Sequence, residues 1–110
     1  MVTEAELSEQ VDKLTNMIRD TQEYKDYIHM VGVIRRNPEL CDEVMRFRKE
    51  NFFLQHAPEH EDVSDRMEEL RRKNEDLLDT PEVYDFFMTE WSFYQIVQNL
   101  HDRLMEGIDF

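Results

Sequence analysis

Hydrophobic residues recur every three or four positions along most of the chain, which is the spacing of one face of an α-helix. A first helix is predicted to begin near Thr3, because Thr3 and Glu6 have the spacing of a capping box. Its apolar stripe is narrow and its other positions are polar, so this helix should lie on a surface or against a partner. The stripe consists of Leu7, Val11, Leu14 and Ile18.

Capping residues and prolines divide the middle of the chain. A second helix is expected to begin at Asp20-Thr21 and to end before Asn37-Pro38, because the residue before a proline avoids the helical region. Asn37-Pro38 then begins a third helix, with an N-cap followed by proline in the first turn. Pro58 predicts a loop over 55–62, and a fourth helix is expected from about Glu61 to Leu78.

The last segment is the most apolar part of the chain. It predicts a long helix that begins at Thr80-Pro81 and runs to Glu106, with Gly107 as the residue that ends it. Its apolar residues cover more than half of the helix circumference, which is typical of a helix buried between others. The pattern predicts an all-α single domain over residues 1–110, an antiparallel bundle of about five helices with the long C-terminal helix at its centre.

Composition narrows the class of protein. Two glycines and three prolines in 110 residues are too few for the turns of a β-sandwich or barrel. The net charge of −13 opposes direct binding to nucleic acid, whose phosphates are negative, and would steer basic partners. The longest uncharged run, Ile28 to Ile34, is too short to cross a membrane. With no apolar signal segment at the start, we expect a cytoplasmic protein.

The predicted loop over 55–62 contains the residue types of a metal site. A metal-dependent hydrolase could use His56, His60 and Glu61 as its site residues, and this enzyme is the least favoured of three functional hypotheses. Pro58 lies between the two histidines and prevents the regular helix that would bring their rings to one face. We therefore expect a mobile, metal-free loop and no catalytic residues.

Other polar residues stand among apolar ones. His29 and His101 lie near apolar faces and are expected to be buried and hydrogen-bonded. Glu90 falls among aromatic residues of the last helix, where its carboxylate needs a partner. We favour an arginine of a neighbouring helix or subunit as this partner over a role of Glu90 as catalytic acid.

Two asparagines and the single cysteine are the remaining candidate functional residues. Asn51 and Asn74 each interrupt an apolar stripe, and either fix the register of a helix pair or mark where a stripe leaves the core. Cys41 stands at a helix start, and we expect its side chain to pack in a core or groove and not to act as an activated thiol. A single cysteine rules out a disulfide within the chain.

The chain contains EYKDY at 23–27, NPEL at 37–40 and TPEV at 80–83, and this order of segments resembles the YlbF/YmcA (Com_YlbF) family of small helical bacterial regulators. The segment 23–27 reads EYKDY and is similar to the family's EYxxY helix start. Asn37-Pro38-Glu39-Leu40, followed by Phe47-Arg48, resembles its NPEL…FR segment. Thr80-Pro81-Glu82-Val83, leading into the aromatic helix, resembles the start of its C-terminal helix. The resemblance extends from about residue 3 to residue 107.

The resemblance implies a non-enzymatic helical protein that works in complexes. Members of the family influence competence, sporulation and biofilm formation, and some act with partner proteins that adjust RNA processing by an endoribonuclease. Some of these complexes carry iron–sulfur clusters through cysteines. This chain offers only Cys41, so a cluster would need ligands from other chains, and no cofactor is expected.

The function predicted from the sequence is a regulatory protein–protein interaction module, with a purely structural helical scaffold as the alternative. The surplus of apolar residues on the first and last helices predicts a homo-oligomer, most simply a dimer. The partner or oligomer interface is expected to contain Leu7, Val11, Leu14, Ile18, Phe87, Trp91, Tyr94 and Leu104.

Overall fold

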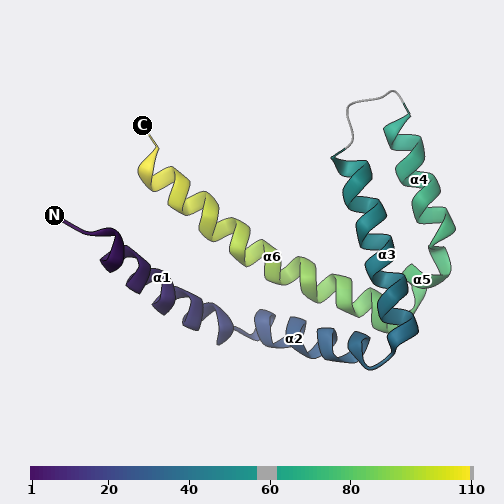
Figure 1. Cartoon of the computed structure of the whole chain (residues 1–110), viewed down its shortest axis with the longest axis horizontal. Coiled ribbons are helices and arrows are strands. Elements are labelled where there is room, and N and C mark those ends of the chain that lie inside the picture. The colour runs from purple at the N-terminus through teal and green to yellow at the C-terminus, as the bar shows by residue number, and fades with distance from the viewer. Residues whose placement is uncertain (57–61, 110) are drawn as a thin grey trace. The chain divides into compact units, whose positions relative to one another are not determined.

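The computed structural model describes residues 1–56 and 62–109, and its regular elements are all α-helices (Figure 1). No strand occurs in these two stretches, so the all-α prediction is confirmed. The helices are α1 (Glu4–Arg19), α2 (Gln22–Arg35), α3 (Pro38–Gln55), α4 (Val63–Lys73), α5 (Glu75–Asp79) and α6 (Pro81–Ile108).

Side-chain caps hold the predicted starts of α1 and α3. The Thr3 hydroxyl accepts a hydrogen bond from the Glu6 backbone N–H and donates one to the Glu6 carboxylate, both at 3.2 Å. The Asn37 side chain accepts the N–H of Leu40 at 3.2 Å, and Pro38 follows it in the first turn. The bonds that Thr3 and Asn37 accept each satisfy a backbone N–H that has no partner within its helix.

The predicted fourth helix is two helices in the structure, because the chain breaks at Asn74. The Asn74 side-chain amide donates to the carbonyl oxygen of Leu70 at 2.8 Å, and its backbone N–H donates to Leu70 and Arg71, both at 3.2 Å. The amide thus satisfies a carbonyl at the C-terminus of α4, and α5 begins at the next residue. The sequence prediction of one helix up to Leu78 is therefore wrong.

The end of the last helix also differs from the prediction. Gly107 lies inside α6, which continues to Ile108, and neither glycine of the chain has a positive φ. Gly107 is therefore not the left-handed residue that ends a helix in the expected capping motif.

The chain consists of two compact units that two helices join. The middle unit contains residues 30–87, and the terminal unit contains residues 1–29 and 88–110. Helices α2 and α6 each contribute one part to both units.

The middle unit contains every fully buried side chain that the structure describes. Val44 of α3 and Val83 of α6 are the most completely enclosed. Phe86 is 4% exposed, packs against Phe87 with ring centroids 5.4 Å apart, and has the Arg48 guanidinium 5.7 Å from its centroid. The core consists of Ile34, Val44, Leu70, Leu77, Val83 and Phe86.

The terminal unit has no such core. Tyr27 of α2 stacks on Phe93 of α6, with ring centroids 5.4 Å apart and an interplanar angle of 6°, and Tyr24 lies at the same distance from Phe93. None of the described residues of this unit is buried. The N- and C-termini lie at the same end of the unit, where α1 runs beside the last turns of α6 (Figure 1).

Gly32 provides a test of local helix stability. It lies inside α2, and a Cβ added there would meet no atom within 4 Å. Gly32→Ala is therefore expected to raise the free energy of unfolding by about 0.5–1 kcal/mol, because alanine loses less backbone entropy in a helix. Urea denaturation followed by circular dichroism measures the change.

Gly107→Ala is the matched control for this substitution. Gly107 has equally open surroundings but lies in the last turn of α6, where helices fray, so the effect there should be smaller. A loss of stability in Gly32→Ala would show that α2 needs glycine at this position.

Candidate protein-binding surface

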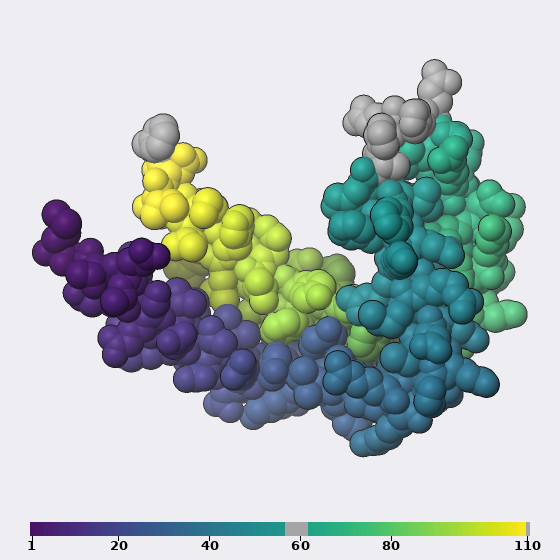
Figure 2. Space-filling model, in the orientation of Figure 1, coloured from purple at the N-terminus to yellow at the C-terminus, as the bar shows by residue number. Residues whose placement is uncertain are grey.

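The largest exposed apolar side chains of the terminal unit lie on α1 and on the C-terminal part of α6. On α1 they include Met17 and, on one face of the helix, Leu7, Val11 and Leu14, a set that we call the α1 stripe. Figure 2 shows α1 and the end of α6 on the face in view, with no other element in front of them. Soluble monomers rarely leave so many large apolar side chains in water.

Helix α6 carries two apolar stripes in this unit. The inner one contains Phe93, Ile96 and Leu100, which are half-buried, and Phe93 receives the two tyrosines of α2. The outer one has the spacing 3, 4, 3, 4 that keeps residues on one helix face. This outer set, which we call the α6 stripe, consists of Tyr94, Val97, His101, Leu104 and Ile108, all of them exposed.

The expectation that α6 is buried between other helices is wrong within this chain. Among the described residues of α6, only Val83 and Phe86 are buried, and both belong to the middle unit. Trp91 is 60% exposed and so is Leu104. The helix is apolar on two sides, as the sequence showed, but its outer side in the terminal unit faces solvent.

The structure divides the eight predicted interface residues into two groups. Phe87 is half-buried in the middle unit, where its ring meets Phe47 edge-on with centroids 5.9 Å apart. Ile18 is half-buried at the end of α1. The others are exposed in the terminal unit: Leu7, Val11, Leu14, Trp91, Tyr94 and Leu104.

Two apolar residues of this surface are not among the eight predicted interface residues. Val97 and Ile108 belong to the exposed α6 stripe. The 3–4 spacing that runs from Tyr94 through Leu104 could have found both.

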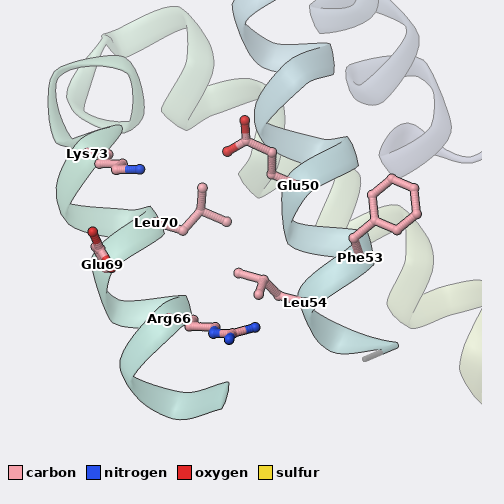
Figure 3. Close-up of a pocket in the computed structure, with 7 residues that line it drawn as sticks. All are labelled: Glu50, Phe53, Leu54, Arg66, Glu69, Leu70 and Lys73. Atoms are coloured by element: carbon pink, nitrogen blue, oxygen red, sulfur yellow. The ribbon is translucent and has the colours of Figure 1, made fainter. Parts of the chain in front are cut away.

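In the middle unit, a groove of about 340 Å³ lies between α3 and α4 (Figure 3). Leu54 and Leu70 point into it from the two helices, and Phe53 lies at its α3 side. Two acids and two bases also line it, so the groove has no net formal charge. The lining residues are Glu50, Phe53, Leu54, Arg66, Glu69, Leu70 and Lys73. None of these seven is a histidine, a cysteine or a hydroxyl-bearing residue that could act as a nucleophile.

The proposed metal ligands cannot be brought together from the described residues. His60 and Glu61 lie outside the described residues, as does most of the predicted loop. His56 caps α3, stacks on Phe52 with ring centroids 4.1 Å apart, and has its Nδ1 atom 2.9 Å from the Phe52 carbonyl oxygen. Within 1–56 and 62–109, no group of three or more potential ligands is placed to hold a metal ion.

Two histidines do not have the environments that the sequence predicted. His29 and His101 are both exposed, so the expectation of two buried histidines is wrong. The Nδ1 atom of His101 lies 3.7 Å from the Asp102 carboxylate. The helix rotation places both rings outside the aromatic contact between α2 and α6, which Tyr24, Tyr27 and Phe93 form.

Three other candidates take structural positions. Glu90 is half-buried in α6, with its Oε2 atom shielded from solvent. Asn51 lies half-buried in a second groove of about 480 Å³, beside Phe47 and Met67. Cys41 is half-buried in the first turn of α3, where its backbone N–H donates to the Asn37 carbonyl oxygen at 2.9 Å.

The helices and the exposed stripes define an all-α protein with two apolar helix faces open to solvent. Comparison with family models gives a match over residues 7–109 to the family described as control of competence regulator ComK, YlbF/YmcA. The chain belongs to this family, and the sequence resemblance is confirmed. Its description makes it a family of regulators. No curated protein and no solved structure matches the chain.

No helix in the described part of the chain is both long and apolar enough to cross a bilayer.

Proposed function

We propose that this chain is a non-enzymatic regulatory protein of the cytoplasm that acts by binding other proteins through its terminal unit. The observation that carries the proposal is the contrast between the two units. The middle unit encloses a core, whereas no described residue of the terminal unit is buried and apolar side chains of α1 and α6 are exposed there. Membership of a family of regulators supports the same function.

The energetics favour a docked state of the terminal unit. Moving a large side chain such as Trp91 from water into an interface stabilises a complex by on the order of 2–3 kcal/mol. Large aromatic residues are also the side chains that most often dominate binding energy at protein interfaces. Trp91 and Tyr94 are both exposed and lie within one turn of α6.

The partners that we propose are other regulatory proteins, among them components of an RNA-processing complex. The net charge of −13 is consistent with contact through proteins and not through the nucleic acid itself. The alternative function is a purely structural helical scaffold, which the same exposed stripes would serve.

Co-purification with two matched variants tests the proposal. Tyr94 and Gln95 are neighbouring exposed residues of α6, but only Tyr94 lies in the α6 stripe. Tyr94→Glu is expected to reduce recovery of a stoichiometric hetero-complex at least tenfold, because it places a charge in an apolar contact. Gln95→Glu adds the same charge outside the stripe and should retain the complex.

Each outcome separates the hypotheses. If both variants retain the complex, the α6 stripe is not the binding surface. If the unsubstituted chain is recovered without any other protein at a stoichiometric level, the scaffold alternative replaces the regulatory one.

A further inference from the structure

We propose that the outer face of α3, in the middle unit, binds an acidic amphipathic helix of a partner protein. This surface belongs to a different unit from the α1 and α6 stripes, so the inference goes beyond the proposed function. Its residues are all exposed and lie in the C-terminal part of α3. The set, which we call the α3 face, consists of Met45, Arg46, Lys49, Phe52 and Phe53.

The first support is the place where the middle unit exposes its large apolar side chains. Met45 and Phe52 are each 56% exposed, and Phe53 is 62% exposed. Among the described residues of this unit, Tyr84 is the one other large apolar residue that is exposed. Apolar side chains that gather on one helix and remain in water are typical of a contact site.

Helix geometry places these side chains on the side of α3 that faces away from the core. Met45, Lys49 and Phe52 follow one another at spacings of four and three, which keeps them on one helix face. The Phe53 ring points away from α4, whereas Leu54 points toward α4 (Figure 3). The α3 face is therefore the side of α3 that the packing of α3 on α4 leaves open.

The phenylalanine rings of the α3 face already pack on one another and on a histidine. Phe52 stacks on His56 with ring centroids 4.1 Å apart, and Phe53 meets Phe52 edge-on at 6.2 Å. The Nδ1 atom of His56 lies 2.9 Å from the Phe52 carbonyl oxygen, which fixes this ring at the end of α3. Side chains that are ordered before binding lose less conformational entropy in a complex.

The charges of the α3 face indicate the kind of partner. Arg46 and Lys49 are exposed, and neither forms an ion pair with a described residue. The nearby acids lie at the margins: Asp42 is one turn before Met45, and Glu50 lines the groove toward α4. In a chain with a net charge of −13, this face thus combines two unpaired cations with exposed apolar side chains.

An acidic amphipathic helix has the complementary chemistry. Its carboxylates would pair with Arg46 and Lys49, and its apolar residues would cover the methionine and the two phenylalanine rings. A basic helix would find no carboxylate within the α3 face. Single-stranded nucleic acid can stack on aromatic rings, but every nucleotide adds a negative charge, and two cations are too few to offset the net charge of −13. A protein helix needs only a few acids opposite the two cations, so it is the favoured occupant.

Fluorescence anisotropy with two labelled helical peptides tests the proposal. The first probe has leucines on one face with glutamates beside them, and the second has a lysine in place of every glutamate. The α3 face predicts that the glutamate probe binds at least about tenfold tighter in 0.15 M salt, where charges beyond about 8 Å are largely screened. The net charge of the whole chain predicts the opposite order.

Two pairs of matched variants locate the binding site. Lys49→Glu is expected to weaken binding of the glutamate probe at least about tenfold, because it brings like charges together. Lys13→Glu makes the same change of charge on α1 and should alter the affinity by less than about twofold. Phe52→Ala should weaken binding at least about fivefold, whereas Tyr84→Ala, which removes a similarly exposed ring outside the α3 face, should not. All four residues are exposed, so the helical content measured by circular dichroism should not change.

The proposal is overturned if the glutamate probe does not bind, or if the lysine probe binds equally well or more tightly. Equal effects of Lys49→Glu and Lys13→Glu would also remove the α3 face as the site. Tighter binding of a labelled single-stranded RNA oligonucleotide than of the glutamate probe would replace the protein helix by a nucleic acid. The co-purification experiment with Tyr94→Glu concerns the terminal unit, so the proposed function and this inference can fail separately.

Discussion

Replacing Phe86 by alanine is expected to lower the free energy of unfolding by about 3–5 kcal/mol, because it leaves a cavity in the core of the middle unit. The ring is 4% exposed and contacts Phe87, and the substitution also removes the ring below the Arg48 guanidinium. Native domains have only about 5–15 kcal/mol of stability, so this loss is a large part of the total. Urea denaturation followed by circular dichroism measures it.

Tyr84→Ala is the matched control. Tyr84 also lies in the first turns of α6, and Tyr84→Ala removes an aromatic ring of similar size. The Tyr84 side chain, however, is 57% exposed. Its removal should change the free energy of unfolding by less than about 0.5 kcal/mol. Equal losses in the two variants would mean that Phe86 does not occupy the core of the folded chain.

The helix starts were predictable because each depends on residues close together in the sequence. Thr3 caps through Glu6, three residues on, and Asn37 caps through Leu40 at the same separation. Such bonds form with little help from the rest of the fold, so the sequence alone indicates them.

The break at Asn74 was not predictable from periodicity. The apolar stripe of Met67, Leu70 and Leu77 continues across it with helical spacing. Where α4 ends, the Asn74 side-chain amide and the Asn74 backbone N–H both donate to the Leu70 carbonyl oxygen. Asparagine can continue a helix or end one, and only the folded structure shows which of the two occurs at this position.

Burial within α6 was not predictable either, because it depends on what lies opposite each turn. Phe86 and Trp91 are both large aromatic residues in one continuous helix, five positions apart. Phe86 is enclosed by the middle unit, and Trp91 is exposed in the terminal unit. The sequence showed that the helix has more apolar surface than one face requires, but it could not show which turns remain uncovered.

The thermal midpoint of this chain is expected to rise with its concentration. If the terminal units are covered only in a dimer, unfolding also separates two chains, and dilution favours the unfolded state. A hundredfold increase in concentration corresponds to about 1.4 kcal/mol per chain, or a rise in midpoint of about 6 °C for a domain of this size. Calorimetry at matched scan rates over that concentration range measures the shift.

Leu104→Glu and Asn99→Glu provide the comparison. Leu104→Glu places a carboxylate in the α6 stripe and should give a midpoint that is independent of concentration, because its chains unfold as monomers. Asn99→Glu adds the same charge on the face of α6 opposite the α6 stripe and should keep the concentration dependence. A constant midpoint for the unsubstituted chain would show that its unfolding is unimolecular and that the exposed stripes do not contribute to stability through a second copy.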